Sequence, residues 1–226
     1  MEYTKVEKGI FLSRPNRFLA KVRLGGGVVE CHVKNTGRCR ELLVPGVEVY
    51  LQKEDNPNRK TKYSLIHVRK GERLVNIDSQ APNRLAKEWL PQCGLFPGDT
   101  VFLPEKTYEN SRFDFYFEHG DTKGYLEVKG VTLEENGVVS FPDAPTLRGE
   151  KHLRELIRCK ESGLEAYVLF VVQMSSVRYF TPNVKNDPGF SKALKEAFHK
   201  GVILLAVDCQ VAPETVTIGQ PVEVKL

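Results

Sequence analysis

Two short segments near the middle of this 226-residue chain, 111–118 and 125–130, constrain its fold more than any other feature. Apolar and polar side chains alternate in both segments, which predicts two β-strands. The six residues between them are mostly polar and include two glycines, as in a hairpin turn. Alternation places Phe113, Phe115 and Phe117 together on one face of the first strand. The other elements of the chain are expected to be organised around this hairpin.

The polar faces of the two strands carry the candidate chemistry. Pairing would bring Asp114 opposite Glu127 and Lys129, at a spacing of about 5 Å. Two carboxylates at that distance repel one another unless a cation lies between them. Asp114 and Glu127 are therefore a candidate metal site for Mg²⁺ or Mn²⁺, because such ions prefer carboxylate oxygens. Lys129 is the third candidate catalytic residue, since an ammonium group there can orient a water or stabilise charge on a phosphate.

The arrangement of one acid followed by Glu-x-Lys resembles the signature of the PD-(D/E)XK nuclease superfamily. Because this motif is short, the alternative is an exposed hairpin with ordinary solvated charges. The surrounding elements favour the superfamily, since they follow its order of helix, three strands, helix, strand. Those expected elements are a helix at 84–90, a strand near 100–108, the hairpin, a helix at 146–162, a strand at 165–173, a helix at about 190–200 and a strand at 202–207. An Asn136-Gly137 turn and a further edge strand within 215–226 complete the expected unit.

The first 81 residues predict a different unit. Five short strands are expected there, at 17–23, 28–33, 47–51, 63–68 and 73–77. That number of strands in so few residues fits a small closed barrel such as an OB-fold, and an SH3-like barrel is the alternative. The predicted fold class is thus α+β or α/β. It consists of an OB-like barrel at 1–81 followed by a PD-(D/E)XK-type αβββαβ domain at 82–226.

Charge is distributed unevenly between these units. Residues 1–81 contain 16 Lys and Arg against 9 Asp and Glu, a net of +7, and residues 82–226 contain 17 against 20, a net of −3. A basic barrel beside an acidic site suits a polyanion that one unit holds and the other processes, although a solvated basic surface is the alternative. The candidate nucleic-acid contacts are polar and basic residues: Arg14, Asn16, Arg17, Asn35, Thr36, Gly37, Arg38 and Arg40 in the barrel, and Arg148 and Lys151 on the helix at 146–162. His152 and Arg154 share the polar face of that helix, which is expected either to contact substrate phosphate or to be solvated.

Composition excludes several other classes. No apolar stretch is long enough to span a membrane, and the first residues lack the apolar core of a signal peptide, so we expect a cytoplasmic protein without a membrane partner. The five cysteines form no C-x-x-C pair, which favours free thiols over a disulfide framework or a zinc site. A sugar- or nucleotide-binding module is a weaker alternative, because the Gly25-Gly26-Gly27 run lacks the following Lys-Ser/Thr of a phosphate-binding loop.

A set of short motifs spanning nearly the whole chain resembles the sugar fermentation stimulation protein A family. The motifs are Arg17-Phe18-Leu19-Ala20, Asn35-Thr36-Gly37, Asn83-Arg84-Leu85, Ser111-Arg112-Phe113-Asp114-Phe115, Glu127-Val128-Lys129, Val131-Thr132-Leu133, Phe141-Pro142-Asp143-Ala144 and, around the helix at 146–162, Arg148-Gly149 with Lys151-His152-Leu153. The resemblance implies an OB-like domain joined to a PD-(D/E)XK-like domain, DNA binding and a link to the regulation of sugar (maltose) metabolism.

The same resemblance carries Asp114, Glu127 and Lys129 onto the superfamily's metal and catalytic positions. It also implies that Glu88 is either a further acidic ligand or a solvated side chain. Asp143 is either a third acid at the metal or the N-terminal cap of the following helix.

Two functions of different classes follow. The first is a metal-dependent nuclease that hydrolyses phosphodiester bonds, with Asp114 and Glu127 at the metal and Lys129 beside the attacking water. The second is a non-catalytic DNA-binding regulator that keeps a nuclease-like fold. In both, the expected partner is DNA, including single strands, because OB-folds bind single strands through basic grooves.

Overall fold

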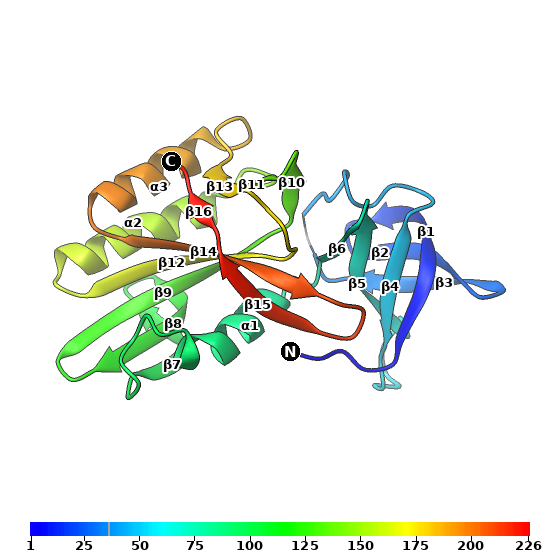
Figure 1. Cartoon of the computed structure of the whole chain (residues 1–226), viewed down its shortest axis with the longest axis horizontal. Coiled ribbons are helices and arrows are strands. Elements are labelled where there is room, and N and C mark those ends of the chain that lie inside the picture. The colour runs from blue at the N-terminus through cyan, green and yellow to red at the C-terminus, as the bar shows by residue number, and fades with distance from the viewer. Residues whose placement is uncertain (36) are drawn as a thin grey trace.

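The computed structural model describes residues 1–35 and 37–226, and its first unit is a β-barrel. The strands of this unit are β1 (Val6–Asn16), β2 (Leu19–Leu24), β3 (Gly27–Val33), β4 (Glu48–Lys53), β5 (Tyr63–Lys70) and β6 (Arg73–Asn76). Their order is β3-β2-β1-β4-β5-β6, and a parallel pairing of β3 with β5 closes the sheet on itself. Strands β1 to β5 thus form the expected OB-like closed barrel, at one end of the molecule in Figure 1.

Strand β1 was not among the five strands expected from the sequence. It mixes charged residues with Gly9 and Pro15, so it shows neither clear alternation nor an apolar run. Gly9 lies at a close approach between strands, where a Cβ atom would be 2.6 Å from Val22 Cγ1 and 2.8 Å from the carbonyl oxygen of Arg23. The predicted number of strands was therefore wrong, although the predicted barrel is confirmed.

The second unit is an α+β domain built on a six-stranded sheet. Its helices are α1 (Ala81–Trp89), α2 (Leu147–Glu161) and α3 (Pro188–His199), and a 3₁₀ turn, Leu90–Gln92, follows α1. Its main strands are β7 (Val101–Tyr108), β8 (Ser111–His119), β9 (Thr122–Val131), β12 (Glu165–Val172), β14 (Ile203–Val211) and β15 (Val216–Pro221). The sheet order is β15-β14-β12-β9-β8-β7, and the central strands β9, β12 and β14 are parallel. Helices α2 and α3 make the crossovers between these parallel strands, as the sequence predicted.

Helices cover both faces of this sheet (Figure 1). Along β12, Val168 and Phe170 belong to the apolar cluster that contains the buried residues of α2 and α3. The intervening residues Leu169 and Val171 belong to a second cluster, with Leu85 of α1. Strand β12 is therefore buried on both sides, which explains its continuously apolar sequence.

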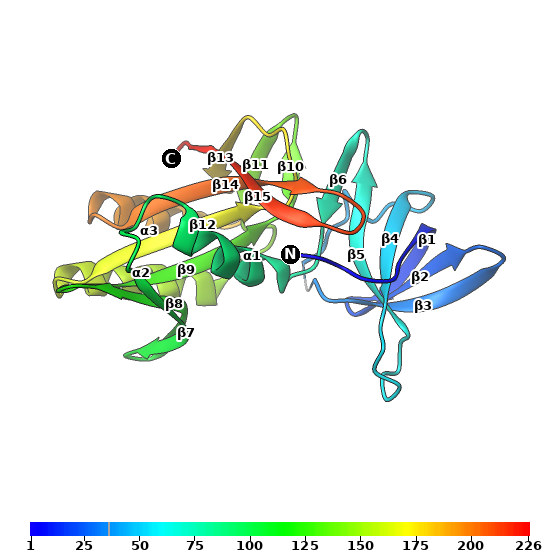
Figure 2. The same cartoon turned by 60° about the horizontal axis from the view of Figure 1, so that its bottom comes forward.

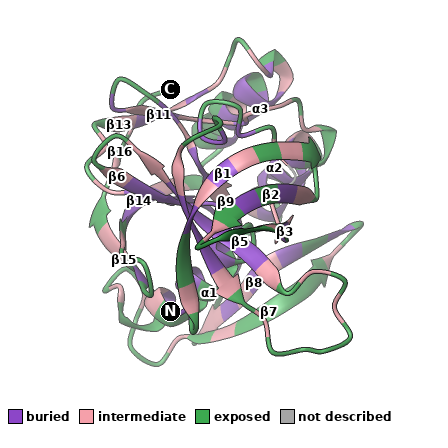
Figure 3. Ribbon diagram, turned by 90° about the vertical axis from the view of Figure 1, so that its right-hand side faces the viewer, coloured by how far each residue is buried: buried purple, intermediate pink, exposed green. Residues whose placement is uncertain are grey.

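A smaller sheet extends beyond the end of β9. Its strands are β10 (Leu133–Glu135), β11 (Val138–Phe141), β13 (Tyr179–Pro182) and β16 (Glu223–Val224). Asn136 and Gly137 connect β10 to β11 with φ angles of 52° and 83°, so the expected Asn-Gly hairpin is confirmed. At the far edge of the main sheet, β7 is mostly exposed (Figure 3).

The two units share a buried polar junction. The N-terminal segment runs from the barrel along the second unit (Figure 2), and Tyr3 donates a hydrogen bond to Asp78 Oδ2 at 3.2 Å. Asn76 Nδ2 donates to the Tyr3 hydroxyl at 2.9 Å, and Gln173 Nε2 donates to Asn76 Oδ1 at 2.6 Å. Because all four side chains are buried, this network fixes the barrel against the sheet.

Two further sequence expectations concern membrane-spanning helices and the state of the cysteines. In the part of the chain that the structure describes, no helix combines the length and the apolar character needed to cross a membrane. All five cysteines are free thiols, and every one except Cys93 is buried.

Candidate active site at the edge between β8 and β9

Asp114 lies where β8 separates from β9. The two strands are paired from His119 opposite Thr122 to Phe115 opposite Leu126. The pairing stops before Asp114. There the Asp114 side chain takes the place of a backbone carbonyl of β8, because its Oδ2 accepts a hydrogen bond from the Val128 backbone N–H of β9 at 2.8 Å.

The other Asp114 oxygen is held by a residue of α1. Asn83, near the start of α1, donates its side-chain N–H to Asp114 Oδ1 at 2.6 Å. Asn83 was not among the predicted site residues, although it stands in one of the family motifs.

The separation of the strands also changes the predicted faces of β8. Phe115 packs in the cluster with α1, but Phe113 packs in the cluster with α2, 5.4 Å from the ring of Tyr125 and 5.6 Å from that of His152. The expectation that Phe113 and Phe115 share a face was therefore wrong. Pairing with β7 is also irregular here, because Glu105, between the partners of Phe113 and Phe115, has a φ of 57°.

Glu127 is the most buried member of the predicted triad, at 4% exposure. Its Oε1 lies 2.5 Å from Lys129 Nζ and 2.6 Å from His152 Nδ1. Its Oε2 is buried without a hydrogen-bond partner among the described residues. One oxygen is thus held by two cationic or donor groups, and the other remains able to accept a ligand.

The sequence analysis expected His152 on the polar face of its helix, whereas the structure buries it beside Glu127. It is buried on α2, whose first turn is capped by the Thr146 side chain accepting from the Gly149 N–H at 3.0 Å. Arg148 Nε donates to His152 Nε2 at 3.4 Å, so the ring proton belongs on Nδ1, which donates to Glu127. The signal for His152 was its place in the Lys-His-Leu motif, one helix after the Glu-x-Lys strand.

The two carboxylates differ in their electrostatics. Burial, together with the nearby negative charge of Glu127, raises the pKa of Asp114 from 3.8 to about 6. Burial also acts to raise the pKa of Glu127, but the Lys129 ammonium and the His152 hydrogen bond outweigh it and lower that pKa. The repulsion between the two acids therefore disfavours mainly the charged form of Asp114. A cation between the two carboxylates would relieve this repulsion.

These residues fit a hard divalent cation. Both candidate ligands are carboxylates, and the Glu127 oxygen without a hydrogen-bond partner is a site where such an ion can be coordinated. Within residues 1–35 and 37–226, no group of three or more His, Cys, Asp or Glu side chains is arranged around a common metal position. The remaining ligands of an ion would thus have to be waters and substrate oxygens, as is common for Mg²⁺.

The two further acids suggested by the family resemblance do not join this pair. Glu88 lies 2.8 Å from the N-terminal ammonium of Met1 and is 53% exposed at its side chain. Asp143 is not the cap of α2, because Thr146 has that role; its Oδ2 instead accepts from the backbone N–H of Arg38, in a barrel loop, at 3.2 Å. Asp143 therefore connects the two units.

The predicted nucleic-acid residues of the barrel gather at this same loop. Arg14 donates to the backbone carbonyls of Arg17, Asn35, Gly37 and Arg38 at 2.8–2.9 Å, so its guanidinium holds the loop together. Asn35 Oδ1 accepts from the Gly37 N–H at 2.8 Å, while the side chains of Arg17 and Arg38 are exposed. Thr36 lies outside the described residues.

Asn16 and Arg40 were also candidate nucleic-acid contacts. Asn16 Oδ1 accepts from the backbone N–H groups of Phe18 and Leu19, at 2.8 and 3.1 Å, and so shapes a turn. Arg40 is exposed.

Arg148 and Lys151 lie close to the acidic pair, on the exposed side of α2. Together with His152 they line a surface hollow at the start of β8, which Asn110 and Arg112 also border. Lys151 Nζ donates to the Asn110 carbonyl at 2.8 Å. The structure thus brings these two predicted residues next to His152, whereas the barrel loop contacts Asp143, which does not join the acidic pair.

A basic groove on the barrel was missed by the sequence analysis. His32, Lys34, Arg59, Lys60 and Gln80 line it. Burial, with the neighbouring charges of Arg59 and Lys34, lowers the pKa of His32. Arg59 pairs with Glu54 at 3.0 Å and Lys34 with Asp78 at 3.1 Å, whereas Lys60 is exposed. No local sequence pattern joins these residues, because they come from three separate segments that only the folded barrel brings together.

Known protein families match both units of this architecture. Residues 12–77 match the family profile described as the SfsA N-terminal OB domain, and residues 80–215 match the profile described as the sugar fermentation stimulation protein RE domain. A sugar fermentation stimulation protein homolog from Desulfitobacterium hafniense is 56% identical over 226 residues, covering 100% of this chain and 99% of the relative. A homolog of the same name from Ruminiclostridium cellulolyticum is 53% identical, with both chains covered in full.

A solved structure shares the whole fold. It is described as the structure of Pyrococcus furiosus SfsA in complex with Ca²⁺, and it matches with a TM-score of 0.88 at 28% identity, covering 100% of this chain and 98% of the other. The barrel, the α+β domain and the relatives agree along the full length. The chain belongs to the sugar fermentation stimulation protein family.

Proposed function

We propose that this protein binds DNA, including single strands, and hydrolyses phosphodiester bonds with the help of Mg²⁺ or Mn²⁺ bound by Asp114 and Glu127. The observation that carries the proposal is the buried Glu127 Oε2, which has no hydrogen-bond partner among the described residues, near a second carboxylate with a raised pKa. If Glu127 and Lys129 formed only a structural ion pair, neither the second acid, Asp114, nor a Glu127 oxygen without a partner would be needed.

The residues of the chain have distinct roles in this proposal. When bound, a divalent ion supplies charge stabilisation and a water of lowered pKa. Glu127 and Asp114 would hold the ion, and His152 is a positioning residue that fixes Glu127 Oε1, which leaves Oε2 to serve as the ligand. Lys129, partly exposed beside Glu127, stabilises negative charge on the phosphate.

The relative from Pyrococcus furiosus supports a divalent-cation site, because its structure is described as a complex with Ca²⁺. Calcium and magnesium both prefer carboxylate oxygens, so a site that accepts one of them has the right ligand chemistry for the other. The name of the relatives also suggests that the DNA-directed activity serves the regulation of sugar metabolism.

A second candidate function is DNA binding without cleavage. It is favoured by the ion pair between Lys129 and Glu127, which neutralises the acid without any metal. It is also favoured by the basic groove on the barrel, which can hold a polyanion without any chemistry at the β8–β9 edge.

Cleavage assays separate these two functions. We expect the protein to cut end-labelled single-stranded oligonucleotides in Mn²⁺ or Mg²⁺ but not in EDTA. Asp114→Asn should abolish cutting, whereas Asp121→Asn, an exposed acid in the turn of the same hairpin, should not affect it. Salt-sensitive binding without cutting in any metal would favour the second function, and equal cutting by Asp114→Asn would exclude the proposed site.

Metal binding can be measured without activity. Calorimetric titration with Mn²⁺ should show a site in the wild type that is lost in Glu127→Gln. The variant keeps the size of the side chain but replaces a carboxylate oxygen with an amide. Unchanged Mn²⁺ binding in Glu127→Gln would contradict the assignment of the metal site.

A further inference from the structure

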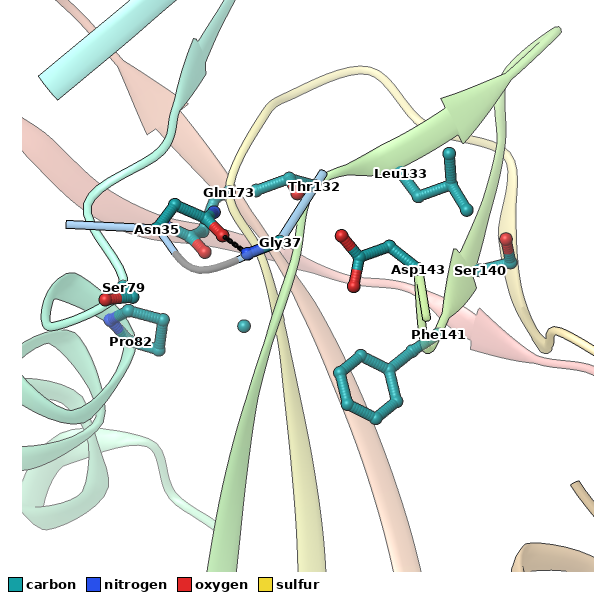
Figure 4. Close-up of a pocket in the computed structure, with 11 residues that line it drawn as sticks. Asn35, Gly37, Ser79, Pro82, Thr132, Leu133, Ser140, Phe141, Asp143 and Gln173 are labelled. Atoms are coloured by element: carbon teal, nitrogen blue, oxygen red, sulfur yellow. Dashed lines mark hydrogen bonds between the residues drawn. The ribbon is translucent and has the colours of Figure 1, made fainter. Parts of the chain in front are cut away.

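Two hollows of the molecule differ in the charge of their walls. Asp143 contributes a carboxylate to the cavity in Figure 4, and no Lys or Arg is among the described residues that line it. The hollow at the start of β8 has the opposite character. Its described lining residues include no carboxylate, and three of them are cationic: Arg112, Arg148 and Lys151. An anion therefore finds its better site at the start of β8.

The three cations of this hollow are largely available to a ligand. Among the described residues, Arg148 has no carboxylate partner, and its side chain makes one hydrogen bond, from Nε to His152 Nε2 at 3.4 Å. Arg112 lies 3.5 Å from Glu105, but the two side chains are 61% and 66% exposed, so water screens this contact. Lys151 donates one of its three N–H groups to a backbone carbonyl, which leaves two.

The neighbouring hollow on α2 shows why the site is confined to one side of Lys151. Glu150 and Glu155 line that second hollow. Arg154, which also lines it, is held by Glu150 at 2.8 Å, and Glu155 lies 3.8 Å from Lys151. Acids offset the cations there, so an anion is expected only on the Arg148 side of Lys151.

The hollow at the start of β8 adjoins the candidate active site through one side chain. Its two buried lining residues are Ser111 and His152. His152 is also the residue whose Nδ1 lies 2.6 Å from Glu127 Oε1, so a group that fills the hollow reaches the ring that orients Glu127. Ser111 Oγ has no hydrogen-bond partner among the described residues, and an acceptor oxygen in the hollow would satisfy it.

We propose that this hollow binds a phosphate group of the DNA substrate, separate from the phosphate that Lys129 faces. The inference rests on the proposed function and adds a second phosphate site to it, on the α2 side of the acidic pair. Arg112 and Arg148 present forked N–H groups that match phosphate oxygens, and Lys151 adds a point charge. A phosphate in this position comes from one of two sources, an internal diester or a terminal monoester of the strand.

Substitutions of exposed arginines test the hollow. Arg112→Gln removes one charge and leaves the contact between Arg148 and His152 in place, whereas Arg148→Gln removes both. Arg154→Gln, further along α2, is the matched control, because Glu150 already holds that side chain. Thermal unfolding checks that each variant is folded. Calorimetric titration of Arg112→Gln with Mn²⁺ should match the wild type, which separates an effect on the hollow from an effect on the metal site.

Three oligodeoxythymidylates of equal length distinguish the two sources of phosphate. One carries a 5′-phosphate, one a 3′-phosphate and one neither. Each competes with a fluorescent oligonucleotide for the full-length protein, in Ca²⁺ and at several salt concentrations.

Each source of phosphate has its own expected result. For a terminal monoester, one phosphorylated oligonucleotide should bind about tenfold more tightly than the unphosphorylated one, and Arg112→Gln should remove that advantage. For an internal diester, all three should bind the wild type alike, and Arg112→Gln should reduce the slope of log affinity against log salt by about 1. Either result, with wild-type binding by Arg154→Gln, supports the site.

The contrary results separate this inference from the function on which it rests. Wild-type affinity and salt slope in both Arg112→Gln and Arg148→Gln would overturn the phosphate site and leave DNA binding intact. Equal losses in Arg112→Gln and Arg154→Gln would also overturn it, because binding would then follow net charge alone. Absence of binding by the wild type to every oligonucleotide at low salt would overturn the proposed function together with the phosphate site.

Discussion

The carboxylate of Asp114 accepts a hydrogen bond from the backbone N–H of Val128 at 2.8 Å, in the place where a neighbouring strand would offer a carbonyl. This contact lets β8 leave β9 without leaving the Val128 N–H of β9 unpaired. It also puts a carboxylate in the gap between the strands, near Glu127. One residue thus ends the strand pairing and supplies an acid to the site.

The repulsion between the two acids predicts a stabilising substitution. Asp114→Asn should raise the free energy of unfolding by about 1–2 kcal/mol at pH 8 in EDTA, because the raised pKa of Asp114 means that its charged form is disfavoured in the fold. Chemical denaturation of the wild type and the variant measures the difference. Asp121→Asn should leave stability unchanged, and a loss of stability in Asp114→Asn would show that the Asp114 charge is not disfavoured in the fold.

His152 should act on metal binding through Glu127. His152→Ala removes the donor to Glu127 Oε1, so we expect Mn²⁺ affinity to fall by about 10- to 100-fold, as for other residues that orient a ligand. Calorimetric titration measures this affinity, and His199→Ala, at the exposed end of α3, is the control. If His152→Ala lowered only the melting temperature and left Mn²⁺ affinity as in the wild type, its role would be structural.

The basic groove should contribute charge to DNA binding. Lys60 is exposed there, and Lys60→Ala should weaken binding of all sequences alike and reduce the slope of log affinity against log salt by about 1. Lys195→Ala removes the same charge from an exposed position on α3, far from the barrel in Figure 1, and should not change the slope. Equal effects of the two substitutions would mean that net charge, rather than the groove, governs binding.

The ion pairs between the two units should make the stability of the protein depend on pH. Glu134 pairs with Lys70 and Arg73 of the barrel, and these hydrogen bonds outweigh burial and lower its pKa from 4.5 to about 2. A carboxyl with a depressed pKa stabilises the fold above its unfolded value, and that contribution is lost as pH falls from about 4.5 to about 2.

Glu134→Gln tests this dependence. The variant should be less stable than the wild type by about 1–2 kcal/mol at pH 7, and the difference should shrink as pH is lowered through 4. Glu135→Gln, at the exposed neighbouring position, is the matched control. A difference that stayed constant from pH 7 to pH 3 would contradict the role of the Glu134 charge.

Much of the architecture could be predicted because its signals are local. The apolar run of β12, the Asn-Gly turn and the helical spacing of α2 each follow from a few consecutive residues. The candidate triad was selected for the same reason, since Glu127 and Lys129 are two residues apart on one strand. Strand β1 was missed because its partners, β2 and β4, decide its structure more than its own mixed sequence does.

What the sequence could not show depends on long-range contacts. Alternation assumes a regular strand, so it could not predict that the irregularity at Asp114 moves Phe113 to the side of α2. The partners of Asp114 and Glu127, Asn83 and His152, come from helices 31 and 25 residues away in sequence. Asp143 could not be placed because its partner lies in the barrel, 105 residues earlier.

A crystal soaked with Mn²⁺ and a short single-stranded oligonucleotide tests the central claim most directly. We predict an anomalous peak at the β8–β9 edge, about 2.1 Å from Glu127 Oε2 and from a carboxylate oxygen of Asp114, with a phosphate oxygen bound to the same ion and Lys129 facing that phosphate. Manganese bound elsewhere, with Glu127 Oε2 still without a ligand and no phosphate near Lys129, would contradict the account.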